Sequence, residues 1–240
     1  DPIAIMLRKL SLFVALIAST ATYADMRSGV AGVHAPRYVH NLLQISSMRL
    51  RGGADVTEKV TGIKFADTIS ADGKALSLMG CGDRKKAILG PMAVNVYAIG
   101  LYVDAAAAKS ATATDVASAA KALNDGTYTK ALKIIMARSV NADKIGNALA
   151  EAVEPKVKGT DAPMAEFKAF FGGLDSLNAG NEITFTQVGS TLKVQVPSAT
   201  KDFSSSALCK ALFEIYLGDS PVSPNGKKSM SEGLLKLCGK

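Results

Sequence analysis

The sequence predicts an α+β fold in which helices cover one face of a large antiparallel sheet. Strand-like segments are concentrated in the first half of the chain, helical segments are interleaved with them, and a hairpin follows late, at residues 182–196. Elements in this order pack as a layer of helices on a sheet. With 48% hydrophobic and 20% charged residues, the 240-residue chain has enough apolar material for a sizeable core.

The late hairpin has the clearest pattern. Its two segments, EITFTQV at 182–188 and TLKVQV at 191–196, alternate apolar and polar residues. This alternation is typical of half-buried antiparallel strands. Gly189 and Ser190 lie between them and suit a two-residue turn that needs a positive φ.

The first half of the chain contains the other strand-like segments. Further strands are predicted near residues 60–65, 74–79, 87–103 and 129–138. Between two of them, the residues GCGDRKK at 80–86 are predicted to form a Gly-rich turn that carries Arg84. The long apolar strand after this turn contains a phenol, Tyr97.

Helices are predicted near residues 112–124, 142–157, 163–172, 204–217 and 228–237. The fourth has one apolar stripe, formed by Phe203, Ala207, Leu208, Ala211, Leu212, Ile215 and Tyr216. Gly218 is expected to end this helix. Glu151 and Glu154, at helical spacing, are expected on a solvent-exposed face.

The N-terminal residues 1–54 are predicted to be a targeting segment that precedes a folded domain at residues 55–240. Arg8 and Lys9 precede an apolar run that ends in small residues, as in a secretory signal. That run is too short to span a bilayer. The basic, acid-poor stretch after it resembles a transit segment, so we expect import into a complex algal plastid; the alternative is a secreted protein with a flexible arm.

The net charge of +7 does not indicate a nucleic-acid-binding protein. Residues 1–53 contain six basic and two acidic residues, a balance of +4, which leaves +3 for the remainder. This remaining charge is small and scattered, whereas a nucleic-acid interface needs a concentrated basic surface. We therefore expect no nucleic-acid partner.

The cysteines and histidines argue against metal, cofactor and histidine chemistry in the domain. Cys81, Cys209 and Cys238 are odd in number and lack a C-x-x-C spacing, so neither a disulfide framework nor a zinc site is indicated. His34 and His40 both lie in the predicted targeting segment. The sequence GCG does not continue as a dinucleotide motif, because Lys85 stands where the third glycine belongs and a strand is expected to follow.

Arg84 and Tyr97 are the principal candidate site residues. A guanidinium stays protonated and offers a planar fork of donors, while a phenol adds one directional donor. At one end of an apolar cavity, the pair would hold a carboxylate or an enolate. The structural alternatives are that Arg84 ties its turn to Asp83 or to a carbonyl group, and that Tyr97 is an ordinary core residue.

Strand alternation suggests an apolar lining for such a cavity. Tyr97 would share one strand face with Ile99 and Leu101, and Asn95 would begin that face. On the next strand the face with Leu132, Ile134 and Met136 ends in a second cation, Arg138. The alternation does not specify which faces meet the cavity, and a row such as the second is more often plain core than pocket lining.

Several motifs, in order, resemble the chalcone isomerase superfamily over roughly residues 56–237. GCGDRKK followed by VNVYAIGLYVD resembles that family's Gly-x-Gly-x-Arg turn and the strand after it. YTKALKIIMARSV resembles the next long strand, FKAFF a helix, and ALFEIYLGDSPVSP the closing helix and turn. The resemblance implies an open-faced β-sandwich, with a ligand cleft between the sheet and the helices on one of its faces.

The superfamily implies two kinds of function. Its enzymes cyclise a chalcone to a flavanone, and a non-catalytic branch in plastids binds free fatty acids. The enzymes place a Thr where Tyr97 stands and use a further Tyr after the next strand, whereas this chain has no Tyr between Thr129 and Ile215. In the fatty-acid-binding branch the Arg and Tyr are spaced as Arg84 and Tyr97 are, with 97 − 84 = 13.

We therefore expect a monomer that binds a long-chain fatty acid or similar amphipathic anion without catalysis, metal or cofactor. Arg84 and Tyr97 would hold the carboxylate. The remaining candidates for the acyl tail and the second charge are Ile99, Leu101, Leu132, Ile134, Met136 and Arg138. The alternatives are an intramolecular lyase of the chalcone isomerase type and a ligand-free auxiliary protein of the same fold.

Overall fold

A seven-stranded antiparallel sheet organises the fold, with the strands in the order β11-β10-β9-β6-β5-β4-β3. The structure is a computed structural model, in which residues 54–89, 92–157 and 163–240 are described. The strands of this sheet are β3 (Thr68–Ala71), β4 (Lys74–Leu89), β5 (Met92–Val103), β6 (Lys130–Met136), β9 (Glu182–Val188), β10 (Thr191–Val196) and β11 (Ala199–Ser204).

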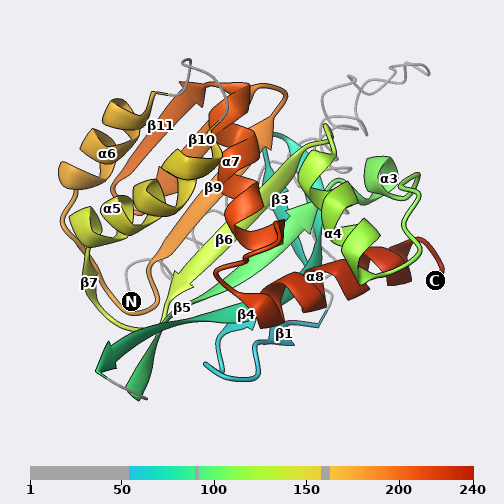
Figure 1. Cartoon of the computed structure of the whole chain (residues 1–240), viewed down its shortest axis with the longest axis horizontal. Coiled ribbons are helices and arrows are strands. Elements are labelled where there is room, and N and C mark those ends of the chain that lie inside the picture. The colour runs from blue at the N-terminus through green and yellow to red at the C-terminus, as the bar shows by residue number, and fades with distance from the viewer. Residues whose placement is uncertain (1–53, 90–91, 158–162) are drawn as a thin grey trace, which may run out of the picture. The chain divides into compact units, whose positions relative to one another are not determined.

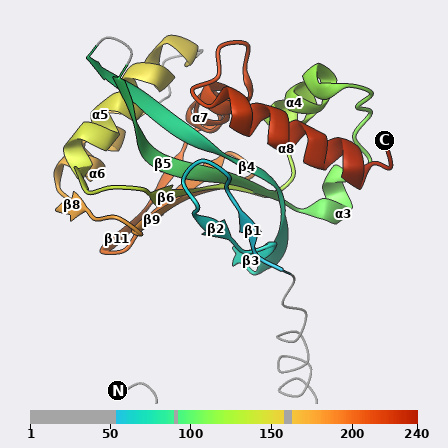
Figure 2. The same ribbon diagram turned by 90° about the horizontal axis from the view of Figure 1, so that it is seen from below.

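Helices cover one face of this sheet (Figures 1 and 2). They are α3 (Ala105–Ala108), α4 (Val116–Asp125), α5 (Ala142–Val153), α6 (Met164–Gly172), α7 (Ser206–Leu217) and α8 (Pro224–Leu237), with a 3-10 turn, η2 (Glu154–Lys156). The main core lies between the helices and the sheet. The predicted layer of helices on an antiparallel sheet is confirmed.

A smaller apolar cluster lies on the opposite face of the sheet, where the short strands β1 (Val56–Thr57) and β2 (Lys64–Phe65) pair with each other. Phe65 packs there with Leu76 and Tyr102. The Tyr102 hydroxyl donates a hydrogen bond to the Ala66 carbonyl oxygen at 2.9 Å, which ties the first residues of the domain to β5.

The predicted late hairpin is confirmed. β9 and β10 have the predicted bounds, and Val188 pairs with Thr191 across a two-residue turn. Gly189 has a φ of +59°, which glycine adopts without a steric penalty. The predicted helices are also present, although α4 begins at Val116 and α8 begins at Pro224. The segment before α7 is β11, a strand that the sequence analysis did not predict.

The predicted Gly-rich turn at residues 80–86 is wrong. These residues lie within β4, and the chain reverses between Leu89 and Met92, inside the segment predicted as one continuous strand. The glycines have a packing role instead. A Cβ atom on Gly80 would lie 2.5 Å from the backbone of Ser229, and one on Gly82 would lie 2.4 Å from the Gly226 Cα atom, both in α8.

Hydrogen bonds reinforce this direct contact between α8 and β4. Ser223, the N-cap of α8, donates from its hydroxyl to the Asp83 carbonyl oxygen at 2.6 Å. The Cys81 amide donates to the Ser229 hydroxyl at 3.3 Å. α8 therefore lies against the backbone of β4 and not on a layer of side chains.

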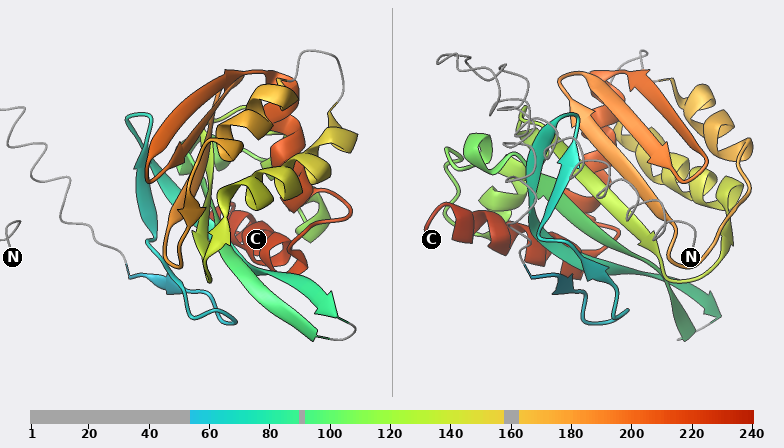
Figure 3. Two further views of the ribbon diagram at one scale, coloured as in Figure 1. Left: turned by 90° about the vertical axis from the view of Figure 1, so that its left-hand side faces the viewer. Right: turned by 180° about the vertical axis from the view of Figure 1, so that it is seen from behind.

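β4 and β5 form a hairpin that extends past the neighbouring strands (Figure 3). β5 pairs with β6 only from Tyr97 to Val103, so residues 92–96 pair with β4 alone. On β4 the partners of Arg84 and Lys85 are Tyr97 and Asn95, which leaves Val96 as an extra residue in a β-bulge. A bulge of this kind bends the strand and changes the direction of the side chains that follow.

A buried lysine joins α4 to the core. Lys130 at the start of β6 is fully buried, and its ammonium group donates 2.7 Å hydrogen bonds to the carbonyl oxygens of Leu123 and Asn124 at the end of α4. The ammonium also lies 4.6 Å from the centre of the Phe213 ring. Burial lowers the pKa of Lys130 to about 8. The ammonium group that caps α4 therefore loses its proton at a lower pH than an exposed lysine does.

The predicted targeting segment lies outside the described residues, apart from its last residue, Ala54. Its signal and transit functions and the plastid destination stay predictions. Its two histidines also lie outside the described residues. Within the described ranges, no helix is both long enough and apolar enough to cross a membrane. Cys81, Cys209 and Cys238 are free thiols, and Glu151 and Glu154 are exposed as expected.

The contact between α8 and β4 predicts that Gly82→Ala destabilises the protein by about 1–3 kcal/mol, because the new methyl group meets backbone atoms that cannot rotate away. Urea denaturation of the full chain measures the change. Gly172→Ala is a matched control, since a Cβ atom on this exposed helix residue meets nothing within 4 Å. That control should be neutral or stabilising by up to about 1 kcal/mol. Equal stability of Gly82→Ala and wild type would contradict the direct backbone packing.

Candidate ligand-binding cavity

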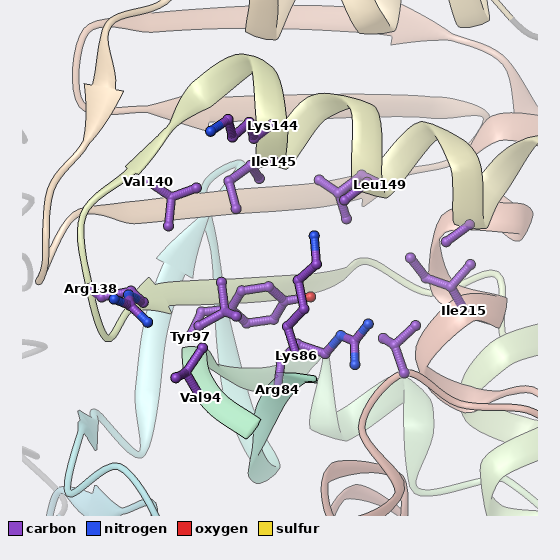
Figure 4. A pocket seen from close by; sticks show the side chains of 14 residues that line it. Arg84, Lys86, Val94, Tyr97, Arg138, Val140, Lys144, Ile145, Leu149 and Ile215 are labelled. Carbon is purple, nitrogen blue, oxygen red and sulfur yellow. The ribbon is translucent and has the colours of Figure 1, made fainter. Parts of the chain in front are cut away.

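A cavity of about 280 Å³ lies between the extended β4–β5 hairpin and α5 (Figure 4). Its walls come from four parts of the chain: the hairpin, the residues after β6, α5, and the end of α7 with the loop after it. The lining residues are Arg84, Lys86, Val94, Val96, Tyr97, Arg138, Val140, Lys144, Ile145, Ala148, Leu149, Ala152, Ile215 and Val222.

Arg84 owes its position to the packing of α8. Alternate residues of β4 share a face, so Gly80, Gly82 and Arg84 form one row. The first two lie under α8, while Arg84 follows the point where this helix begins and projects into the cavity. Its side chain is partly exposed, and Nη1 donates to the Lys85 carbonyl oxygen at 2.5 Å. This bond leaves the other guanidinium donors available for a ligand.

Tyr97 lies directly opposite Arg84 across the β4–β5 pair. Its hydroxyl shares a 3.0 Å hydrogen bond with the hydroxyl of Tyr216 from α7, and both rings are buried. Burial raises the pKa of Tyr97, although the bond to Tyr216 and the charge of Arg84 partly counter this. Burial also raises the pKa of Tyr216 well above its usual value. Both phenols therefore stay protonated at neutral pH and act as donors.

The bulge at Val96 decides which residues of β5 accompany Tyr97. Simple alternation placed Asn95 on the face of Tyr97, and this expectation is wrong. The extra residue shifts the alternation, so that Val94 and Val96 line the cavity and Asn95 does not. The wall beside the phenol is consequently apolar.

α5 forms the facing wall. Ile145, Leu149 and Ala152 recur at helical spacing on its inner face. Ala148 lines the cavity and is nevertheless exposed, so the cavity opens to solvent along this side of the helix. These wall residues were not among the predicted site residues, although the apolar stripe within the predicted helix at 142–157 is the sequence signal that could have found them.

The charge of the cavity is of one sign. Four lining residues are cationic, namely Arg84, Lys86, Arg138 and Lys144, and none of the described lining residues is acidic. None of these four forms an ion pair with another described residue. Because the rest of the lining is largely apolar, the cavity suits an amphipathic anion.

Three of the predicted site residues meet at this cavity: Arg84, Tyr97 and Arg138. The other five do not line it. Ile99, Leu101, Leu132, Ile134 and Met136 lie in the main core between the sheet and the helices, with at most 1% of their surface exposed. Helix packing fills the space over this part of the sheet.

Other groupings of chemically active residues do not compete with this cavity. The described residues contain no group of three or more His, Cys, Asp or Glu side chains that could hold a metal ion. A recess on the opposite face of the sheet is polar, and its charged residues include the ion pairs of Lys133 with Glu182 and of Lys193 with Asp72.

Comparisons with known proteins agree with the architecture. The model of the family described as chalcone isomerase-like matches residues 57–235. A curated relative, fatty-acid-binding protein 1 of Arabidopsis thaliana, is 24% identical over 202 residues, covering 76% of this chain and 71% of the relative.

A crystal structure of the Arabidopsis thaliana fatty-acid binding protein superposes with a TM-score of 0.68 at 21% identity, covering 78% of this chain and all of that chain. This similarity confirms the chalcone isomerase-like fold expected from the motifs. The family model spans most of the chain and includes both sides of the cavity. The chain belongs to the chalcone isomerase-like family.

Proposed function

We propose that this protein binds a long-chain fatty acid in the cavity between the β4–β5 hairpin and α5, without catalysis. The observation that carries the proposal is an open apolar cavity with cationic residues, a neutral phenol, Tyr97, that is hydrogen-bonded to the buried Tyr216, and no acidic residue among its described lining. The relative named as a fatty-acid-binding protein has the same fold and supports this assignment.

In the proposed complex, Arg84 and Tyr97 hold the carboxylate. Arg84 donates two parallel hydrogen bonds, and Tyr97 donates a third while it accepts one from Tyr216. Each hydrogen bond to a charged group contributes about 1.5–3 kcal/mol net. The acidic form of the ligand is disfavoured, because the guanidinium stabilises the carboxylate anion.

The acyl chain would lie along Val94, Val96, Ile145 and Leu149. Eleven buried methylene groups would contribute roughly 9 kcal/mol, against an association cost of about 4–15 kcal/mol. The cavity volume of about 280 Å³ is near the lower end of the usual range of about 300–1,000 Å³ for ligand sites. A long chain would therefore extend into the opening beside Ala148.

The two alternatives have less support from the site. A ligand-free auxiliary protein would fill the space with its own side chains, whereas here the space beside Arg84 is open. A chalcone isomerase-type lyase would use a Thr at the position of Tyr97 and a Tyr after the next strand, as the family resemblance implies. Here the position of that Thr is taken by Tyr97, and the second phenol, Tyr216, comes from α7.

Native purification of the full chain, followed by mass spectrometry of the small molecules that it carries, tests the proposal. We expect a fatty acid in stoichiometric amount and no conversion of chalcone to flavanone by the same sample. Flavanone formation without bound lipid would overturn the proposal in favour of the lyase, and neither lipid nor turnover would favour the auxiliary protein.

Arg84→Ala is expected to weaken fatty-acid binding by about 10- to 100-fold, since it removes the charge-assisted bonds to the carboxylate. The fold should be retained, because the one hydrogen bond that Arg84 donates within the described residues goes to its neighbour's carbonyl group. Titration calorimetry with dodecanoate measures the change.

Lys64→Ala provides the matched control. Lys64 carries the same charge, is exposed, forms no ion pair with the described residues and does not line the cavity. Its loss should alter dodecanoate affinity less than about twofold. If the two variants bind equally well, Arg84 does not hold the carboxylate.

Tyr97→Phe and Tyr216→Phe are expected to differ in their affinity for dodecanoate but to have a similar free energy of unfolding. Each breaks the same buried hydrogen bond and should cost about 1–3 kcal/mol of unfolding free energy. Tyr97→Phe should also weaken dodecanoate binding by about fivefold or more, because it removes the donor nearest the carboxylate. Equal affinities of the two variants, measured by calorimetry beside urea denaturation, would exclude Tyr97 as a ligand donor.

A further inference from the structure

We propose that Arg138 and Lys144 form a second anion site at the opposite end of the cavity from the Arg84 guanidinium, so that the cavity takes an apolar chain with an anionic group at each end. This inference rests on the proposed function, because Arg84 and Tyr97 hold the first anionic group. It goes further in naming a dianionic ligand class and two residues that would select it.

The positions of the two arginines follow from the strand register. Arg84 pairs with Tyr97, and Tyr97 pairs with Met136, so Arg84 and Met136 lie two strand spacings apart, about 10 Å. Arg138 lies two residues beyond Met136, in the bend that follows β6.

Figure 4 shows the two side chains on opposite sides of Tyr97. The Arg84 guanidinium points towards the Ile215 end, and Arg138 lies at the end near Val140 and Lys144. The Ala137 amide donates to the Val96 carbonyl oxygen at 3.0 Å, which holds the chain beside the bulge just before Arg138. One carboxylate at Arg84 would leave Arg138 without contact to it.

The region between the two charged ends is apolar. Val94, Val96 and Ile145 line this region, and Lys86 projects from β4 into the space beside Arg84 (Figure 4), so a hydrocarbon chain between two anionic groups would contact mostly apolar side chains. A fatty acid bound at Arg84 brings only a hydrocarbon chain to this part of the cavity, so Arg138 and Lys144 gain no interaction with an anionic group from it. A second anionic group at that end would meet two cations.

The position of Lys144 is not explained by helix stability. It lies in the first turn of α5, where the helix macrodipole disfavours a cation, and the N-cap residue Asn141 makes no side-chain capping bond. The nearest acid on this element, Asp143, accepts a 2.7 Å hydrogen bond from the Lys144 amide and does not line the cavity. Arg138 and Lys144 are both exposed and form no ion pair with the described residues, so both are available to a ligand.

Three ligands of equal chain length test the inference on the full chain: dodecanedioic acid, its monomethyl ester and dodecanoic acid. In wild type, the diacid should bind roughly tenfold more tightly than the monoester, which lacks the second charge. In the double variant R138A/K144A this ratio should fall to about two, the statistical factor for two equivalent ends. Titration calorimetry at pH 8 keeps both carboxyl groups ionised.

The double variant K59A/K109A is the matched control. It removes two exposed lysines that lie away from the cavity and form no ion pair among the described residues, so the net charge changes equally. Its ratio of diacid to monoester affinity should remain that of wild type. Preservation of the wild-type ratio in R138A/K144A would show that these two cations do not bind the second anionic group. A similar loss in the control would show a general effect of charge. Either result would overturn the second site.

Dodecanoic acid separates this inference from the proposed function. If dodecanoate binds and the diacid has no advantage beyond the statistical factor, the second site is wrong and the fatty-acid site stands. If neither ligand binds, both proposals fail. Weaker binding of dodecanoate to R138A/K144A than to the control by more than about threefold would show that these cations belong to the first site.

Discussion

The direct contact between α8 and β4 is the packing constraint on which the site depends. Gly80 and Gly82 have no side chains to separate helix from strand, so Arg84 is the first residue of their row that can project beyond the helix. The hydroxyl of Ser223 and the backbone of Asp83 fix the end of α8 at this point. This contact between two backbones thus sets where the Arg84 side chain projects into the cavity, whether or not a ligand is bound.

The part of the β4–β5 hairpin that extends past the sheet forms one wall of the cavity. Beyond Tyr97 the hairpin has no further sheet neighbour among the described strands, so α5 can face it across an open space. Because of the bulge at Val96, the side chains of Val94 and Val96 line that space and Asn95 does not. Polar groups are therefore confined to the ends and the rim, which is the distribution that an amphipathic anion requires.

Burial keeps the chemistry of the site simple. Tyr97 and Tyr216 are donors because burial raises the pKa of both phenols, and Arg84 lies nearby as a cation. A fixed cation with neutral donors binds an anion without a proton transfer. One fold can host different functions, and these side chains, not the sheet itself, favour the proposed binding of an anion.

The sequence by itself determined the family, the helix-on-sheet architecture, the late hairpin and the pairing of Arg84 with Tyr97. These follow from periodicity, residue type and motif order, which are local properties. The tertiary structure decided the remaining features. Gly80 and Gly82 serve helix packing and not a turn, the bulge exchanges Asn95 for valines, and the row at Leu132 and its neighbours is core. Periodicity shows which residues share a face, but register and the helices that pack above that face determine whether the space is filled.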